Sequence, residues 1–381
     1  MTRTRVVVFF GTRPEAIKLA PVVRVLEATG AFETLIINTG QHQEMLEPIL
    51  RSLDLTAHLD LRVMRAEQSL ADLTARLLVA CDLMLTQFAP SVALVQGDTT
   101  TAFAAALACF YRKIGVAHVE AGLRTHRLDA PFPEEMNRVL SARLCDLHFA
   151  PTERAKRNLL AEGVAEKQIE VTGNTVIDAL LAEVERQKRP DVRAGIEATL
   201  AQALGARGRP YLLVTGHRRE NFGRPLRELC AALAMLATRY ADHDIVYPVH
   251  LNPNVRETVH AVLRNASNVK LVEPLPYPEF VALMRDCRLV LTDSGGIQEE
   301  APSLGKPVLV MREATERPEG IEAGTVRLVA PEATAIVRDV SHLLDDRAAY
   351  ERMALAANPY GDGRASQRIV ARLVQHAGAR G

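Results

Sequence analysis

Short runs of apolar, mostly β-branched residues alternate along the chain with longer stretches in which apolar residues recur every three or four positions. The short runs are typical of buried strands, and the longer pattern is typical of helices that cover a sheet. Such an alternation predicts parallel sheets with right-handed crossovers. The strands predicted in the first half are residues 6–10, 34–38, 92–96, 116–120, 147–150 and 169–172.

A polar stretch from about Glu185 to Pro210 interrupts this rhythm, which then resumes. We therefore predict an α/β protein of two Rossmann-like, doubly wound domains. The N-terminal domain is expected to comprise residues 1–173 and a C-terminal helix at 366–381, and the C-terminal domain residues 174–365. The strands predicted in the second half are residues 211–215, 244–249, 268–272, 288–292 and 306–311.

The composition is typical of a soluble globular protein. A chain of 381 residues is long for one core, which favours more than one domain. Lys and Arg together number 46, as do Asp and Glu, so no overall field attracts nucleic acid or an anionic membrane. We therefore expect neither of these partners.

The N-terminus and the cysteines both favour a cytoplasmic protein. Only five apolar residues, 6–10, precede Gly11, which is too short a run for a signal peptide or a membrane span. The cysteines form no C-x-x-C pair and lie in apolar surroundings, so we expect buried, reduced thiols. They are Cys81, Cys109, Cys145, Cys230 and Cys287.

Glycine and charged residues follow most of the predicted strands. Ligands of open parallel sheets bind beyond the carboxyl ends of the strands. Ordinary turns before helices also favour Gly, Asp and Ser, but five charged groups at the same edges of two sheets favour a binding cleft between the domains. The segments concerned are 11–15, 97–100, 120–124, 216–221 and 293–296.

In the second half, residues 293–296 read Asp-Ser-Gly-Gly and precede a predicted helix. The unpaired N–H groups and the dipole at a helix N-terminus favour phosphate. Glu300, one turn further on, could accept hydrogen bonds from ribose hydroxyls, and Arg13, Lys18 and Arg317 could supply cations for a diphosphate. A simple serine cap with glycines for close packing explains this motif equally well.

The first half supplies acidic residues instead. Asp98 and Glu120 end strands that are neighbours in the series, and Glu134 begins a predicted helix that also carries Arg138. A glutamate at a helix start is commonly a surface group that complements the helix dipole, so Glu134 alone is a weak candidate. His217 could contact a phosphate or transfer a proton.

Several familiar sites have no counterpart in the sequence. No G-x-G-x-x-G follows a strand, no G-x-x-x-x-G-K-[ST] exists, and the histidines lack metal-ligand spacing. His118 lies in the middle of a predicted strand and is expected in the core. We therefore expect neither a nicotinamide cofactor nor a metal.

Seven segments resemble the bacterial non-hydrolysing UDP-N-acetylglucosamine 2-epimerases, in order and over nearly the whole chain. The resemblance implies a glycosyltransferase B-type fold, an active site between two domains and a homodimer. The segments are 11–23 (GTRPEAIKLAPVV), 96–111, 118–125 (HVEAGLRT), 131–138 (PFPEEMNR), 171–180, 215–221 (TGHRREN) and 293–320.

The resemblance also implies a reaction that supplies cell-surface polysaccharide synthesis. UDP leaves C1 of UDP-N-acetylglucosamine as the C2 proton is removed, which gives 2-acetamidoglucal and bound UDP. Re-addition with protonation from the other face then gives UDP-N-acetylmannosamine. This route needs no cofactor, because loss of a good leaving group compensates for the low acidity of the C2 proton.

The resemblance assigns residues to each role. It implies a catalytic group of Asp98, Glu120, Glu134, Arg138 and His217. The implied substrate contacts are Arg13, Lys18, Asp98, Glu120, His217, Phe280, Ser294, Gly295, Gly296, Glu300 and Arg317. Leu275 replaces a glutamine that many relatives have beside the uracil. Contacts to an activating second UDP-sugar correspond to Gln41, His42 and Arg218, and Glu44 replaces a glutamine of activated relatives.

Four alternatives stay open from the sequence. A hydrolysing 2-epimerase would share the fold and release UDP, although residues 131–138 and 314–320 fit the non-hydrolysing group better. A glycosyltransferase would need an acceptor site, and a non-catalytic sensor would not need all three carboxylates. A close relative of the substrate, such as a UDP-2,3-diacetamido uronic acid, is the fourth alternative.

Overall fold

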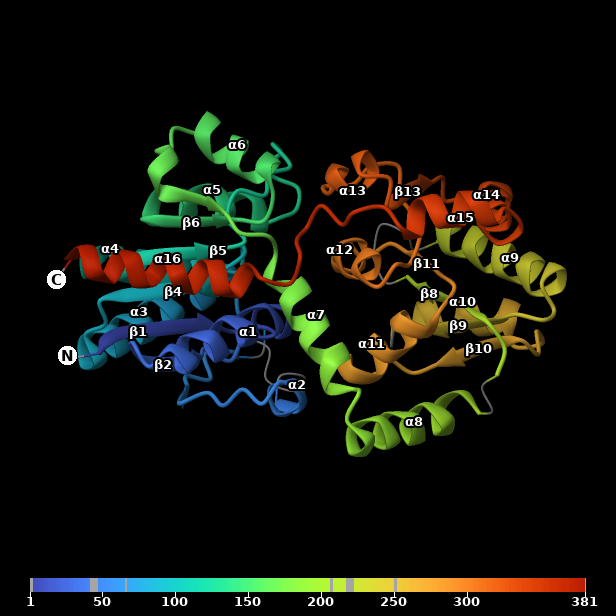
Figure 1. Cartoon of the computed structure of the whole chain (residues 1–381), viewed down its shortest axis with the longest axis horizontal. Helices are drawn as coiled ribbons and strands as arrows, with labels where there is room; N and C mark the ends of the chain where they lie inside the picture. Colours follow the sequence, from blue (N-terminus) through green and yellow to red (C-terminus); the bar gives the residue numbers. More distant parts are fainter. Residues whose placement is uncertain are drawn as a thin grey trace. The chain divides into compact units, whose positions relative to one another are not determined.

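The computed structural model describes residues 3–41, 47–65, 67–205, 208–216, 223–249 and 252–380. The chain forms two compact units, and each contains its own parallel sheet with helices packed against it (Figure 1). The first unit comprises Met1–Leu181 and Tyr360–Gly381, and the second comprises Ala182–Pro359.

The sheet of the first unit has the strand order β3-β2-β1-β4-β5-β6-β7, and all its pairs are parallel. The chain order reverses between β1 and β4, which makes this position the topological switch point where α/β sheets bind ligands. The strands are β1 Thr4–Phe10, β2 Phe32–Asn38, β3 Leu59–Asp60, β4 Val92–Gln96, β5 Gly115–Val119, β6 Leu147–Ala150 and β7 Ile169–Val171.

The helices of the first unit cover this sheet. Helix α4 packs against α3 and α5, and α1 packs against α16, so the two ends of the chain meet in one unit. The helices are α1 Arg13–Thr29, α2 Glu47–Ser52, α3 Leu70–Phe88, α4 Thr100–Tyr111, α5 Glu134–Leu144, α6 Glu153–Ala161, the 3₁₀ helix Glu166–Gln168, α7 Thr175–Arg186, which continues into the second unit, and α16 Ala365–Arg380.

The second unit repeats the same topology. Its parallel sheet has the order β10-β9-β8-β11-β12-β13, with the switch point between β8 and β11. The strands are β8 Tyr211–Thr215, β9 Asp244–Pro248, β10 Val269–Val272, β11 Leu289–Thr292, β12 Val308–Met311 and β13 Val326–Val329. The helices are α8 Pro190–Leu204, α9 Arg224–Arg239, α10 Pro253–Leu263, α11 Tyr277–Asp286, α12 Gly295–Ser303, α13 Pro318–Glu322, α14 Ala333–Asp345 and α15 Arg347–Ala354.

The predicted fold class is confirmed, with local differences. The polar stretch after Glu185 mostly forms α8, which buries Ile196, Leu200 and Leu204 at a spacing of four residues. The strand predicted at residues 116–120 ends at Val119. The short strands β3 and β13 were not predicted, because two to four residues carry little periodic signal.

The C-terminal helix is tied to the first unit by a buried carboxylate. Asp178 of α7 accepts hydrogen bonds from the backbone N–H groups of Ala365 and Ser366, at 3.2 and 2.7 Å. This contact satisfies donors at the start of α16 that have no partner within the helix.

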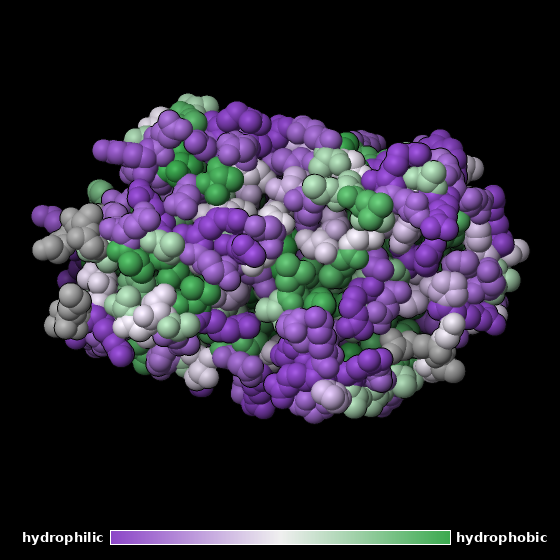
Figure 2. Space-filling view, in the orientation of Figure 1, coloured by the Kyte–Doolittle hydropathy of each residue, from purple (hydrophilic) through white to green (hydrophobic). Residues whose placement is uncertain are grey.

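The cysteine thiols and the surface are two further features of the structure. All five cysteines are buried free thiols, as predicted. Hydrophilic side chains cover most of the face drawn in Figure 2, and apolar ones form small patches on it. Among the described residues, no helix is long and apolar enough to cross a membrane.

Candidate active site

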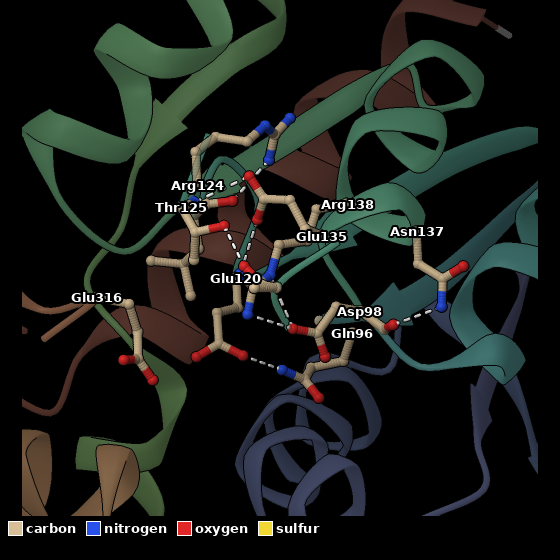
Figure 3. Close-up of polar contacts among 12 residues, drawn as sticks. Gln96, Asp98, Glu120, Arg124, Thr125, Glu135, Asn137, Arg138 and Glu316 are labelled. Carbon is tan, nitrogen blue, oxygen red and sulfur yellow. Dashed lines mark hydrogen bonds and ion pairs between the residues drawn. The ribbon is translucent and has the colours of Figure 1, made fainter. Parts of the chain in front are cut away.

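Three acidic residues predicted from the sequence lie on elements at the carboxyl edge of the first sheet. Asp98 follows β4, Glu120 follows β5, and Glu134 is the first residue of α5. Strands β4 and β5 are hydrogen-bonded neighbours, which confirms that Asp98 and Glu120 end adjacent strands. Figure 3 shows the contact of Glu120 with Gln96 and, close by, the contacts of Asp98 with Asn137 and Arg138.

Glu120 has a backbone conformation that glycine usually adopts. Its φ is +63°, where the side chain of an L-residue crowds the backbone at a cost of about 1 kcal/mol or more. The turn stops the strand and leaves the carboxylate 8% exposed among donors. Lys18 Nζ lies 2.7 and 2.6 Å from its two oxygens, Asn174 Nδ2 donates at 2.8 Å, and Gln96 Nε2 also donates. These donors stabilise the ionised form.

Asp98 is held by contacts from α5 and β5. Arg138 Nε and Nη2 lie 2.8 and 2.6 Å from Asp98 Oδ2, and Asn137 Nδ2 donates to the Asp98 carbonyl at 2.9 Å. His118 Nε2 lies 2.7 Å from the carbonyl oxygen of Gly97, the preceding residue. His118 is buried in the core as predicted, and burial lowers its pKa from 6.5 to about 4.

Glu134 and Glu135 are adjacent but differ in their surroundings. Glu135 is 0% exposed, and its Oε1 accepts hydrogen bonds from the N–H groups of Thr125 and His126 at 2.8 and 2.9 Å. Its Oε2 lies 3.0 Å from Arg138 Nη1. Glu134 is partly exposed, and its side chain makes no hydrogen bond or ion pair with the described part of the chain.

In the second unit, the turn from β11 into α12 lies at the switch point. Thr292 Oγ1 lies 2.6 Å from Thr215 Oγ1 of β8 and accepts the N–H of Ser294 at 2.9 Å. Ser294 precedes α12, and a Cβ on Gly295 would lie 2.5 Å from Arg317 Nη1. Glycine at this position therefore lets a guanidinium lie against the start of the helix.

The cation at this turn is held in place by acidic neighbours. Arg317 makes ion pairs with Glu299 and, at 2.9 Å, with Glu316. Glu300 is buried and accepts a hydrogen bond from the Tyr277 hydroxyl at 3.1 Å, while burial beside this carboxylate raises the pKa of Tyr277. Backbone N–H groups, a guanidinium and a carboxylate therefore occur together at the start of α12.

The remaining predicted residues have varied surroundings. Arg13 is the exposed first residue of α1, and Phe280 is partly buried on α11. Gln41 Oε1 accepts a hydrogen bond from Thr101 Oγ1 at 3.0 Å. His42, Glu44, His217 and Arg218 lie outside the described residues, so their predicted roles stay predictions. Leu275 lines a pocket of about 310 Å³ in the second unit, together with Ala203, Val249, Arg256, His260, Leu271, Val272 and Glu273.

The sequence did not single out Gln96, Asn174 or Glu15, which all contribute polar contacts around the acidic residues. Gln96 and Asn174 lie on segments with no charge to mark them, and Glu15 resembles an ordinary helix-start residue. No group of three or more His, Cys, Asp or Glu side chains within the described ranges is arranged to hold a metal ion.

Comparison with known proteins decides the family. Residues 24–374 match the sequence profile of the family described as UDP-N-acetylglucosamine 2-epimerase. The chain is 51% identical to the UDP-N-acetylglucosamine 2-epimerase of Yersinia pestis, over 98% of this chain and 99% of that protein. This chain belongs to the UDP-N-acetylglucosamine 2-epimerase family. A second member, from Escherichia coli K12, is 51% identical over 97% of this chain and 98% of its own length.

Solved structures of UDP-N-acetylglucosamine 2-epimerases have the same fold. The Neisseria meningitidis enzyme bound to UDP-GlcNAc is 45% identical, with a TM-score of 0.90 over 98% of this chain and 100% of that chain. The Methanocaldococcus jannaschii enzyme in complex with UDP-GlcNAc and UDP is 34% identical, with a TM-score of 0.81 and the same coverage. A glycosyltransferase from Rickettsia africae, 13% identical with a TM-score of 0.63, shares the fold alone.

Proposed function

We propose that this epimerase interconverts UDP-N-acetylglucosamine and UDP-N-acetylmannosamine by inverting C2 of the sugar. The observation that carries the proposal is the set of three acidic residues at one sheet edge, Asp98, Glu120 and Glu134, in three different environments. Family membership and the UDP-GlcNAc bound to the Neisseria meningitidis enzyme support the choice of substrate.

The proposed reaction is an elimination followed by an addition. A carboxylate removes the C2 proton, the C2–H electrons form a C1=C2 double bond, and the C1–O electrons leave with UDP. The intermediate is 2-acetamidoglucal. UDP then attacks C1 again, while an acid delivers a proton to the opposite face of C2. Atoms balance without oxidation, and the same groups serve both directions.

The environments of the three acidic residues suggest different tasks. Glu120 is held ionised by Lys18 and two amides, which suits stabilisation of positive charge at C1 as UDP departs. Glu134 makes no ion pair with the described residues and is partly exposed, so we assign proton exchange at C2 to it. Asp98, oriented by Arg138, is the second candidate for proton transfer.

We propose that UDP is bound by the turn from residues 294 to 296 at the start of α12. The N–H groups of this turn and the Arg317 guanidinium suit a diphosphate. Glu300 is proposed to accept hydrogen bonds from the ribose. In this assignment the predicted domain of residues 174–365 binds UDP, and the domain of residues 1–173 and 366–381 supplies the carboxylates.

We also propose a homodimer in the cytoplasm. Helices α3 and α4, which pack against each other, expose large apolar side chains that a second copy could cover: Val79, Leu83, Phe110 and Tyr111. Buried free thiols are consistent with a reducing compartment. Light scattering should give a dimer mass that Leu83→Asp converts to a monomer mass; a parental monomer would refute the proposal.

The reaction is tested by incubation with UDP-N-acetylglucosamine in D₂O, followed by NMR. Both epimers should acquire deuterium at C2 without net release of UDP, and neither a chelator nor added NAD should change the rate. Steady UDP release would identify a hydrolysing enzyme. Product that keeps its original C2 hydrogen would rule out exchange with solvent. A panel that includes a UDP-2,3-diacetamido uronic acid identifies the preferred sugar.

A further inference from the structure

We propose that Glu15 is a positioning residue that joins the turn after β1 to the turn after β4 and thereby orients Asp98 for the reaction. This inference rests on the proposed function, because Asp98 is a candidate for proton transfer. Glu15 itself lies within α1 and is not placed among the groups that contact the substrate.

The carboxylate of Glu15 is shared between two turns. Glu15 is 1% exposed, and its Oε2 accepts hydrogen bonds from the Gly11 N–H at 3.0 Å, the Thr12 N–H at 2.9 Å and the Thr12 hydroxyl at 2.7 Å. Its Oε1 accepts the hydroxyl of Thr99 at 2.7 Å. One side chain thus binds residues that precede α1 and the residue that precedes α4.

A second helix of the same unit shows what helix capping alone requires. In α3, Asp72 occupies the same third position and accepts hydrogen bonds from its own cap residue, Ser69. Glu15 adds a link to another loop, and it does so inside the protein, where burial raises its pKa from 4.5 to about 7. A helix cap alone would not need a buried carboxylate.

The link to Thr99 determines how the residue after Asp98 is held. The Thr99 hydroxyl has one proton, which it donates to Glu15, and its oxygen accepts the Ala102 N–H at 3.0 Å to cap α4. On the other side, Asn137 holds the carbonyl of Asp98. The backbone around Asp98 is therefore fixed by Glu15 and by α5 together.

The two turns lie at the switch point between β1 and β4, where the backbone of Gly11 packs closely against neighbouring side chains. A Cβ on Gly11 would lie 2.2 Å from Thr39 Oγ1 and 2.5 Å from Thr101 Oγ1. Turns in such close contact move together, so a shift in the turn that precedes Arg13 reaches the turn that contains Asp98. Misplacement of a catalytic group by about 1 Å can cost about 10²-fold in rate.

The test compares Glu15→Gln, Thr99→Val and the double variant. Glutamine cannot accept hydrogen bonds at both ends, and valine removes the Thr99 link without changing the Thr12 turn. We expect each single variant to lower kcat about tenfold with less than about a threefold change in KM. The double variant should lose much less than the product of the two single losses, because both variants break the Glu15–Thr99 link. Thr99→Ser keeps the hydroxyl and should therefore keep the parental turnover.

The matched control is Asp72→Asn, which removes a capping carboxylate from α3 and should leave kcat at the parental value. Parental kcat in Thr99→Val, or a double variant whose loss equals the product of the single losses, would overturn the proposal. Hydrogen exchange of residues 97–102 should become faster in Glu15→Gln, and unchanged exchange would also overturn it. This readout does not depend on the substrate, whereas a parental protein that does not epimerise UDP-N-acetylglucosamine would refute the proposed function instead.

Discussion

The ammonium of Lys18 lies 2.7 and 2.6 Å from the two carboxylate oxygens of Glu120, and both side chains are largely buried. A lysine predicted to bind the diphosphate of UDP is thus paired with a carboxylate predicted to act on the sugar. Buried partners of opposite charge depend on each other, because either one alone would be an uncompensated charge.

Lys18→Met should therefore destabilise the protein as well as reduce turnover. Glu120 would lose the ammonium that lies against both of its carboxylate oxygens, so the free energy of unfolding should fall by about 3 kcal/mol. Urea denaturation measures this loss. The double variant Lys18→Met/Glu120→Gln should regain most of the stability and none of the activity. Equal instability of both variants would mean that the loss does not come from an unpaired charge on Glu120.

Glu134→Gln should lower turnover, whereas Glu135→Gln should lower stability. Glu134 has no partner within the described chain, so its variant should lower turnover by about 10²-fold and leave the melting temperature unchanged. Glu135 accepts two backbone N–H groups and pairs with Arg138, so its variant should lose about 1–3 kcal/mol of stability. Near-parental turnover of Glu134→Gln would remove it from the catalytic group.

Gly295→Ala tests the proposed phosphate site. The added methyl would displace the Arg317 guanidinium from the start of α12, and we expect UDP affinity measured by calorimetry to fall about tenfold. Stability should change little, because only the end of a flexible side chain must move. Gly195→Ala, in α8 where a Cβ meets no atom within 4 Å, is the matched control and should bind UDP normally.

The two buried histidines, His118 and His148, should lower the free energy of unfolding as the pH falls from 6.5 to 4. Burial lowers the pKa of both His118 and His148, which pair across β5 and β6, from 6.5 to about 4. Below pH 6.5 the unfolded chain binds protons that the folded protein excludes, so each histidine lowers the free energy of unfolding by about 3 kcal/mol by pH 4. Above pH 6.5 neither histidine lowers the stability, whereas Glu15, with its pKa raised to about 7, lowers it as the pH rises above 4.5.

The variant His148→Leu isolates this effect, because His148 is 1% exposed and burial is the main cause of its lowered pKa. Denaturation at pH 7 and pH 4.5 should show a smaller loss of stability in the variant than in the parental protein. Equal losses in the two proteins would mean that His148 does not titrate in this range.

The strand pattern and much of the candidate site were predictable because they depend on local sequence. Apolar runs such as residues 92–96 must be buried, and parallel pairing brings the carboxyl ends of neighbouring strands to one edge. Asp98 and Glu120 could therefore be placed at adjacent strand ends without a structure. The helix α8 was missed because its buried positions are few and lie within a polar stretch.

The sequence by itself determined the two parallel sheets, the edge of each sheet that carries charged residues and the acidic residues that lie there. The tertiary structure decided which of these groups are committed to other contacts. Glu134 and Glu135 have the same chemistry and adjacent positions, yet only the packing of α5 against the turn at residues 125–126 buries one of them. Glu15 reaches Thr99 across 84 positions of sequence, and Glu120 adopts its positive φ among donors from α1, β4 and the loop before α7. Hydrogen bonds between residues far apart in the chain leave no periodic trace in the sequence, because their partners become neighbours only when the sheet forms.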